Sequence, residues 1–278
     1  MIPRRFFLLS GASLFMPAMS RAEERARLAF GGSMEQGGLV IGHALPGAKV
    51  RIDEKSVLVS PQGIFAFGLT YDCARPVKVI AQFADGTSES TEVNATARQY
   101  EVQTINGLPE NLVSPSEEDL KRIEHERELV WQARVPETEG LGFAEPLDWP
   151  VPGIISSVYG SRRVLNGKPS APHLGVDIAA PEGTPIHASA EGVVALAGDF
   201  LEEGGITLLD HGHGVSTCYL HQSKRMVAPG DKVGRGDVIG LVGRTGRATG
   251  PHTHWGLAWF QVKLDPSRST RTREPPRA

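Results

Sequence analysis

The chain of 278 residues is poor in cysteine, in aromatic residues and in net charge. Its two cysteines are too few for a disulfide-stapled scaffold or a cysteine-rich zinc module. The formal net charge of -3 argues against a nucleic-acid binder, because such a protein needs a basic surface to meet the phosphates. Hydrophobic residues at 40% and charged residues at 22% are ordinary globular values, which exclude a wholly disordered chain and a multi-span membrane protein.

Glycine and proline, in contrast, are abundant, with 32 and 20 residues. Together with an aromatic content of only 6%, they favour many turns and short strands over long helices. At roughly 150 residues per domain, the length suggests about two domains. We therefore expect a mainly β protein that folds as two units.

An export signal is predicted over residues 1–22. Arg4 and Arg5 form a positive segment, an apolar run follows, and the small residues Ser20 and Ala22 offer a cleavage site. The run of about a dozen residues is too short to cross roughly 30 Å of hydrocarbon, so we expect no stable membrane span after signal removal. Export by the Sec or the twin-arginine route would place the mature chain in the periplasm or the cell-wall space.

Between residues 28 and 105, short β-branched runs are separated by turn signals. Val50 and Ile52, and then Val57 and Val59, alternate with polar residues as they do in half-buried strands. Strands at this spacing predict a small, immunoglobulin-like β-sandwich. The segment contains no cluster of chemistry-bearing side chains, so we interpret it as an accessory domain that acts as a spacer or binding module.

A helical linker is predicted over residues 114–135. Ser114 as the N-cap, Pro115 at the first helical position and Glu117 three residues after the cap form a capping box. A narrow apolar stripe is expected along one side of the helix. The stripe consists of Leu120, Ile123 and Val130.

Strand-like runs return between residues 150 and 266, where Gly-rich turns separate them. The following segment, residues 267–278, is rich in Arg, Pro, Ser and Thr, and its composition predicts a disordered tail. Cys73 and Cys218 fall in different predicted domains, so we interpret them as small buried residues and not as a disulfide.

Histidines in this segment carry the functional signal. His252 and His254 are two apart, so in a strand their side chains project from the same face. His173 and Asp177 are four apart, which also places them on one face, and Gly175 between them has no side chain to block a metal. Two histidines and one carboxylate suit a catalytic zinc ion, because three protein ligands leave one position for water.

The motifs of this segment resemble those of the lysostaphin-type, or LytM-like, zinc metallopeptidases, which hydrolyse peptide bonds in bacterial peptidoglycan. The resemblance covers about residues 150–266 and implies a C-terminal lysostaphin-like antiparallel β domain. The main matching motifs are His173-Leu174-Gly175-Val176-Asp177, Tyr219-Leu220-His221 and Pro251-His252-Thr253-His254.

The resemblance also implies roles for five residues. His173, Asp177 and His254 would hold one Zn²⁺ per chain, and His221 and His252 would be catalytic. In zinc enzymes generally, the metal lowers the pKa of its bound water from 15.7 toward about 7 and acts as a Lewis acid on the carbonyl. The cleaved bond, in a stem peptide or a cross-link, stays open, as do the division of roles between the two catalytic histidines and the oligomeric state.

A non-catalytic peptidoglycan-binding or amidase-regulating module with the same fold is the alternative. Relatives of that kind have typically lost some of the five residues, whereas all five are present here. Gly256 departs from the family, which often has Glu at this position.

Two further pairs of polar residues lie in the same segment. Arg162 and Arg163 either contact substrate at the cleft or lie in a solvated loop. His211 and His213 are interpreted as structural residues at a turn and not as a second metal site.

Overall fold

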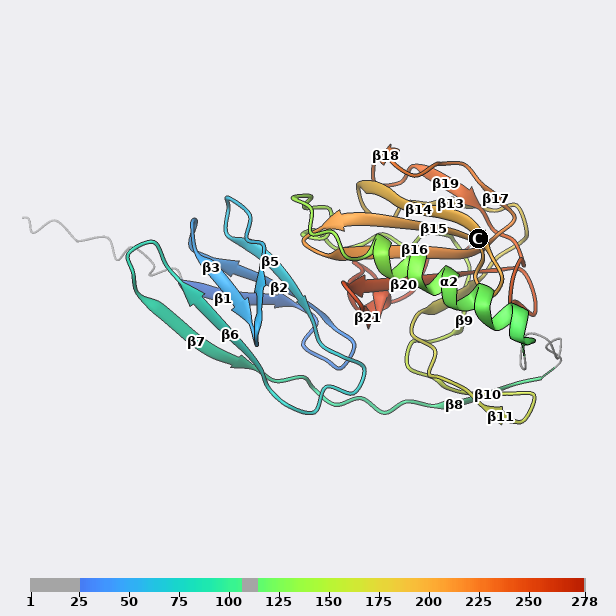
Figure 1. Ribbon diagram of the computed structural model, residues 1–278, viewed down its shortest axis with the longest axis horizontal. Coiled ribbons are helices and arrows are strands. Elements are labelled where there is room, and N and C mark those ends of the chain that lie inside the picture. The colour runs from blue at the N-terminus through green and yellow to red at the C-terminus, as the bar shows by residue number, and fades with distance from the viewer. Residues whose placement is uncertain (1–25, 107–114, 278) are drawn as a thin grey trace, which may run out of the picture.

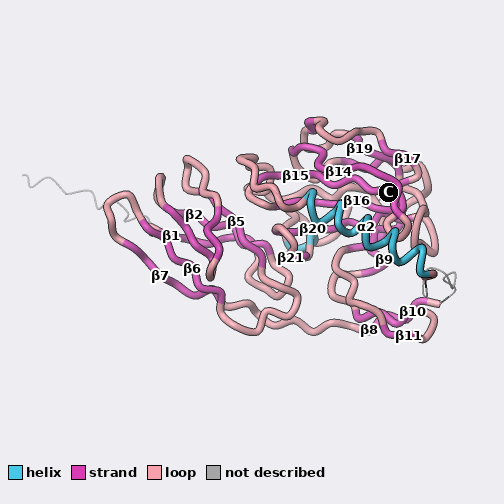
Figure 2. Tube along the Cα trace, viewed as in Figure 1, coloured by secondary structure: helices cyan, strands magenta, loops and turns pink. Residues whose placement is uncertain are grey.

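The computed structural model describes residues 26–106 and 115–277, and it confirms that the protein is mainly β (Figure 1). Figure 2 shows strands in both halves and one α-helix in the part of the chain that is described. None of the described helices is both long and apolar enough to cross a membrane. The export signal predicted for residues 1–22 lies outside the described residues.

Two antiparallel sheets form the N-terminal part. One has the strand order β1-β2-β5 and the other β4-β3-β6-β7, and both contribute to one buried core. In β3 the side chains of Val50 and Ile52 are buried while those of Lys49 and Arg51 are exposed, which is the alternation that the sequence predicts. The immunoglobulin-like class stays a prediction. The strands are β1 (Leu28–Gly32), β2 (Leu39–Ala44), β3 (Lys49–Ile52), β4 (Lys55–Val57), β5 (Ile64–Gly68), β6 (Val77–Gln82) and β7 (Ser88–Val93).

Strand β8 (Val102–Ile105) does not join either N-terminal sheet. It crosses to the C-terminal part and pairs in parallel with β10 (Arg162–Leu165), which in turn pairs with β11 (Lys168–Pro169) (Figure 1). The predicted accessory domain, residues 28–105, therefore ends in a strand that packs with the other half of the chain. The backbone groups of β8 find their partners there, and the sequence of a single strand does not reveal its partner.

Helix α2 (Glu117–Ala133) begins later than predicted. Its N-cap is Ser116, whose hydroxyl accepts a hydrogen bond from the backbone of Asp119, and the Asp119 carboxylate completes the capping box. The predicted cap, Ser114, lies outside the described residues. A carboxylate at the third helical position serves the same purpose as the expected Glu117, because both accept the free backbone N–H of the cap.

Polar contacts, more than an apolar stripe, attach α2 to the C-terminal part. Ile123 is buried, but Leu120 is 53% exposed, so only part of the expected apolar stripe packs against the rest of the protein. Glu126 is buried and accepts hydrogen bonds from Arg122 and from the backbone N–H of Leu201 at 2.8 Å. These contacts hold the helix beside the turn that follows the long strand β14 (Gly192–Phe200).

An eight-stranded antiparallel sheet forms the C-terminal part, with the order β18-β14-β15-β16-β20-β12-β9 and with β21 beside β20. A smaller sheet has the order β13-β19-β17. The large sheet contains β9 (Ile154–Ser157), β12 (Val176–Ala179), β14 (Gly192–Phe200), β15 (Gly204–Gly212), β16 (Val215–Gln222), β18 (Lys232–Val233), β20 (His252–Trp259) and β21 (Val262–Leu264). The small sheet contains β13 (Pro185–His187), β17 (Lys224–Arg225) and β19 (Val238–Leu241).

The C-terminal segment differs from the disordered tail that its composition predicts. A 3₁₀ turn at Pro266–Arg268 begins it, and Thr270 bridges to Leu147. The backbone N–H of Gly153 then donates to the carbonyl of Pro276 at 3.0 Å. Leu147 and Gly153, far away in the sequence, supply these partners, so order here comes from tertiary contacts and not from local composition.

Candidate metal centre

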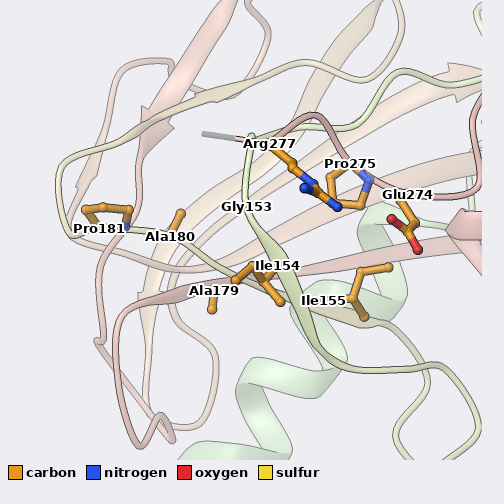
Figure 3. Close-up of a pocket in the computed structure, with 9 residues that line it drawn as sticks. All are labelled: Gly153, Ile154, Ile155, Ala179, Ala180, Pro181, Glu274, Pro275 and Arg277. Carbon is orange, nitrogen blue, oxygen red and sulfur yellow. The ribbon is translucent and has the colours of Figure 1, made fainter.

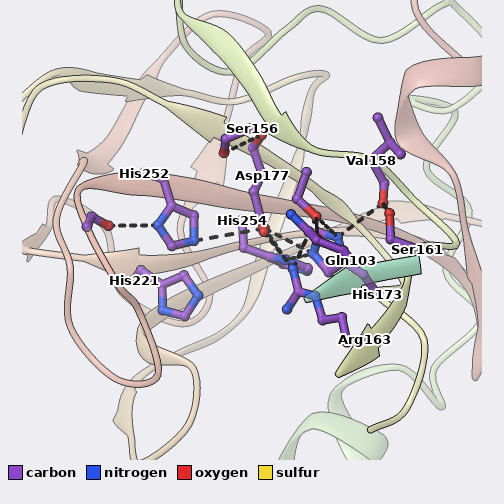
Figure 4. A network of polar contacts seen from close by, with 12 residues as sticks. Gln103, Ser156, Val158, Ser161, Arg163, His173, Asp177, His221, His252 and His254 are labelled. Carbon is purple, nitrogen blue, oxygen red and sulfur yellow. Dashed lines mark hydrogen bonds and ion pairs between the residues drawn. The ribbon is translucent and has the colours of Figure 1, made fainter. Parts of the chain in front are cut away.

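Three side chains direct their donor atoms to one point at the junction of β12 and β20 (Figure 4). Nε2 of His173 lies 2.9 Å from Nδ1 of His254 and 3.0 Å from Oδ1 of Asp177. Nδ1 of His254 lies 2.9 Å from the same carboxylate oxygen. Two of the three residues are buried and the third is half-buried, so the cluster lies below the surface.

The strand register explains why these residues meet. Asp177 on β12 lies directly opposite His254 on β20 in the antiparallel ladder. His173 lies just before β12, and Gly175 separates it from the strand. A Cβ atom on Gly175 would collide with the imidazole ring of His254, so glycine is required for this close approach. Thr253 points to the other face and is fully buried, as the alternation of a strand demands.

The cluster fits a zinc ion by donor type and by spacing. Zinc bonds of about 2.0–2.1 Å at tetrahedral angles separate neighbouring donor atoms by about 3.3 Å. The donor atoms of His173, Asp177 and His254 lie 2.9 to 3.0 Å apart, so small side-chain adjustments would admit the ion. Two imidazoles and one carboxylate also form a donor set that zinc prefers.

Asp177 uses its two oxygens in different directions. Oδ1 faces His173 and His254, while Oδ2 accepts a hydrogen bond from the guanidinium of Arg163 at 2.7 Å. Burial alone would raise the pKa of this carboxyl, but the side chains of His173 and His254 beside it hold the pKa well below its usual value. Asp177 is therefore an anion at neutral pH, which is the form that binds a metal.

Contacts on its far side orient the ring of His173. Its Nδ1 lies 3.0 Å from the hydroxyl of Ser157 and 3.2 Å from the carbonyl oxygen of Val158. The same hydroxyl donates to Oε1 of Gln103 on β8 at 2.7 Å and accepts from Arg163 at 3.3 Å. The sequence alone did not identify Gln103 or Ser157 as parts of the site. It left Arg163 either at the cleft or in a solvated loop, whereas Arg163 lies on β10 and binds Asp177.

His221 and His252 lie beside the cluster, so the structure brings all five predicted residues together. Their ring centroids are 4.7 Å apart, and Nε2 of His252 lies 3.9 Å from Oδ1 of Asp177. Each ring is fixed through Nδ1, which lies 2.8 Å from a backbone carbonyl oxygen, that of Thr245 for His221 and that of Gly250 for His252. His221 has a positive φ of 63°, a conformation that is uncommon outside glycine.

These contacts set the protonation of the two rings. A carbonyl oxygen only accepts hydrogen bonds, so Nδ1 carries the proton in both residues and Nε2 has a free lone pair in the neutral ring. Burial, followed by the neighbouring His252 and His254, lowers the pKa of His221 to about 3. The ring of His221 is therefore neutral near pH 7.

A groove of about 380 Å³ connects the cluster to the surface, and α2 forms one of its walls. Its lining includes five cationic side chains but only two acidic ones, Glu202 and Glu203. Glu202 is paired with both Arg127 and Arg247, and burial raises the pKa of Glu203. The cationic residues are Arg127, Arg134, Arg163, Arg247 and Lys263. The groove consequently carries an excess of positive charge.

Arg134 stands out among these cations. It is only 8% exposed, and no acidic side chain of the described residues lies within ion-pair distance of it. A buried guanidinium without an acid beside it favours an incoming anion, because its charge is poorly screened.

Figure 3 shows a second cavity, of about 710 Å³. Its walls come from β9, from the end of β12 and from the C-terminal segment, and they are mostly apolar. It contains none of the five histidine and aspartate residues. The cluster of His173, Asp177 and His254 opens into the groove beside α2 instead.

The remaining histidines of this half have structural environments. His211 lies buried in β15 and not at the predicted turn, with its ring between the carbonyl of Glu191 and the hydroxyl of Thr217. His213 adopts a positive φ of 51° in the turn between β15 and β16, as the assignment to a turn anticipates. Gly256 lies opposite Cys218, whose Sγ would be only 2.6 Å from a Cβ atom, so this strand leaves no room for the glutamate that the family often has.

Comparison with known proteins agrees with this arrangement. Residues 171–266 match peptidase family M23. A crystal structure assigned to peptidase M23 from Pseudomonas aeruginosa is 32% identical and superposes with a TM-score of 0.66, over 85% of this chain and 94% of that one. The chain therefore belongs to peptidase family M23, and the resemblance to LytM-like peptidases is confirmed.

Two curated relatives each match part of the chain. The peptidoglycan DD-endopeptidase ShyA of Vibrio cholerae is 46% identical over 104 residues, which cover 37% of this chain and 24% of that protein. The DD-carboxypeptidase/endopeptidase Mpg of Neisseria meningitidis is 48% identical over 83 residues, which cover 30% of this chain and 19% of that protein. The matches thus span about a quarter or less of the length of these relatives.

Proposed function

We propose that the protein is a zinc-dependent endopeptidase that hydrolyses peptide bonds in peptidoglycan, in its stem peptides or cross-links. The observation that carries the proposal is the cluster of His173, Asp177 and His254, whose donor atoms lie within 3.0 Å of one another beside two further histidines. When bound there, zinc would supply Lewis-acid chemistry. The remaining steps fall to side chains of the chain itself.

His221 and His252 would move the protons. Each has Nδ1–H bound to a backbone carbonyl, so each keeps an Nε2 lone pair that can take a proton from water. Once protonated, the same Nε2–H can donate to the oxyanion that develops on the substrate, or to the leaving amine. Both rings are held rigidly, which favours a defined orientation toward the scissile bond.

Peptidoglycan as the substrate is supported by two observations. ShyA and Mpg are named for endopeptidase activity, and ShyA for peptidoglycan. The groove beside the cluster is cationic, and peptidoglycan stem peptides carry carboxylates, so its charge complements them. Action on this polymer would place the protein in the periplasm or the cell-wall space, in agreement with the predicted signal.

We propose the domain division that the sequence predicts, with one change. Residues 28–105 would contain the accessory β-sandwich and residues 150–266 the peptidase domain, with the α2 linker between them. Strand β8 would belong with the peptidase domain, because its hydrogen-bond partner is β10.

Digestion of purified murein, with and without a chelator, tests the proposal. We expect released fragments, identified by mass, whose formation stops with the chelator and resumes after zinc is added back. A zinc content below about 0.1 per chain with all ligands intact would contradict zinc dependence. Full zinc loading without any released fragment would favour the non-catalytic binding or amidase-regulating module.

A further inference from the structure

The hydroxyl of Ser157 has all its hydrogen-bonding capacity in use. A hydroxyl has one proton and two lone pairs, and a guanidinium only donates. Ser157 therefore accepts from Arg163 at 3.3 Å and gives its own proton to Oε1 of Gln103 at 2.7 Å. The remaining lone pair faces Nδ1 of His173 at 3.0 Å, so that Nδ1 must carry a proton.

The hydrogen bonds of Ser157 set the tautomer of His173 in the candidate metal centre. When Nδ1 of His173 is protonated, Nε2 of the neutral ring has the free lone pair. Nε2 is the atom that lies 2.9 Å from His254 and 3.0 Å from Asp177. The carbonyl of Val158, 3.2 Å from Nδ1, favours the same tautomer. A chain of hydrogen bonds from Gln103 through Ser157 to His173 thus directs the Nε2 lone pair of His173 toward the proposed metal position.

The pairing of β8 with β10 positions the residues of this hydrogen-bonded chain next to the candidate metal centre. Gln103 and Arg163 are direct neighbours in the parallel ladder. One reaches His173 through Ser157, and the other binds Oδ2 of Asp177 at 2.7 Å. Figure 4 shows Gln103 and Arg163 on the same side of the cluster as His173, opposite His221 and His252. Gln103 also lies well outside residues 171–266, the segment that matches the family.

We propose that Gln103 is a positioning residue of the metal centre, which fixes the tautomer of His173 through Ser157 and so makes zinc binding depend on strand β8. This inference rests on the proposed function, because it assigns Gln103 a role toward the metal proposed there. It is distinct from that function, since Gln103 neither belongs to the cluster of His173, Asp177 and His254 nor lines the groove beside α2.

Three variants of the full chain test the role of the acceptor oxygen. Gln103→Met keeps the length of the side chain but removes the oxygen, while Gln103→Ala removes both. Gln103→Glu keeps an acceptor at the same place. The matched control is Thr104→Ala, which changes the exposed next residue of the same strand. Zinc affinity is measured by competition with a chromophoric chelator, and folding by circular dichroism.

We expect Gln103→Met and Gln103→Ala to weaken zinc binding about tenfold, the lower end of the usual effect of losing such an outer contact. Gln103→Glu and Thr104→Ala should bind zinc as the parent does. Nitrogen NMR of the metal-free imidazoles gives a second measurement: the parent should show His173 protonated at Nδ1, and the two non-accepting variants a mixture of tautomers.

Zinc affinity within twofold of the parent in both non-accepting variants would overturn the inference, as would equal weakening in Thr104→Ala. A parent that binds zinc and releases no murein fragment would overturn the proposed function but leave this inference standing. A parent that binds no zinc would overturn both.

Discussion

Asp177 and His254 are direct neighbours across two antiparallel strands, and their facing donor atoms are 2.9 Å apart. Side chains alternate along a strand, so a shift of the register by one residue would send one of them to the opposite face. The hydrogen bonds between β12 and β20 therefore maintain the candidate metal centre as well as the sheet. His173, which lies outside the strand, completes the set from the preceding loop.

His254→Ala is expected to abolish both zinc retention and murein hydrolysis, because it removes one of the three proposed protein ligands. Zinc content after dialysis and fragment release would be measured on the same preparation. His125→Ala, which changes an exposed histidine of α2, is the matched control and should leave both unchanged. Zinc bound one per chain in the His254 variant would remove His254 from the ligand set.

His221→Ala should separate binding from catalysis. His221 is not among the three clustered donors, so zinc content should stay near that of the parent. Loss of a residue that transfers protons typically costs about 10² to 10⁴ in rate, so murein hydrolysis should fall by at least a hundredfold. Hydrolysis at the parental rate would show that the catalytic role assigned to His221 is wrong.

Gly175→Ala tests the steric requirement beside His254. The added methyl group would overlap the imidazole ring, so the ring must turn away and zinc affinity should fall about tenfold or more. Gly234→Ala is a suitable control, because the nearest atom to its added Cβ, Oδ2 of Asp237, lies at an ordinary 3.4 Å. Competitive zinc titration of the two variants gives the comparison, and equal affinities would show that the ring has room to move.

The stability of the metal-free protein should depend on pH. Burial lowers the pKa of His254 to about 4, against about 6.5 in an unfolded chain. Between these values only the unfolded chain takes up the proton, so stability is complete above about pH 6.5 and is lost as the pH falls toward 4. For this residue alone the loss from pH 7 to pH 5 is on the order of 2 kcal/mol.

Urea unfolding of chelator-treated protein at pH 7, 6 and 5 would measure this loss. His254→Leu, which has no titrating group, should show a smaller decrease in the unfolding midpoint over the same range. Identical midpoints at pH 7 and pH 5 in the parent would contradict the lowered pKa.

The sequence predicts the pattern of the site because its signals are local. His252 and His254 are two apart on one strand, so simple alternation anticipates that they share a face. The spacing of His173 and Asp177 also points to one site, although His173 lies before β12 and not in a strand. The β-rich fold follows from the same alternation and from the many turn residues. What the sequence cannot supply is the pairing of distant segments.

Gln103 and Ser157 illustrate that limit. They are 54 positions apart, and nothing in the sequence around either residue identifies the other. Arg163 resembles any arginine of a polar loop until β10 and Asp177 are placed beside it. The same holds for Pro276, whose carbonyl accepts a hydrogen bond from the backbone of the distant Gly153. In each case the partner becomes visible only after the chain has folded.

The course of strand β8 bears on how the protein can be shortened. A fragment cut to residues 171–266, where the family match lies, would retain His173, Asp177 and His254 but lose Gln103, the strand that carries it, and Arg163. Its metal would then be held by ligands whose outer hydrogen bonds are replaced by water. Truncated forms for biophysical work should therefore start ahead of β8, even though such fragments are longer than residues 171–266.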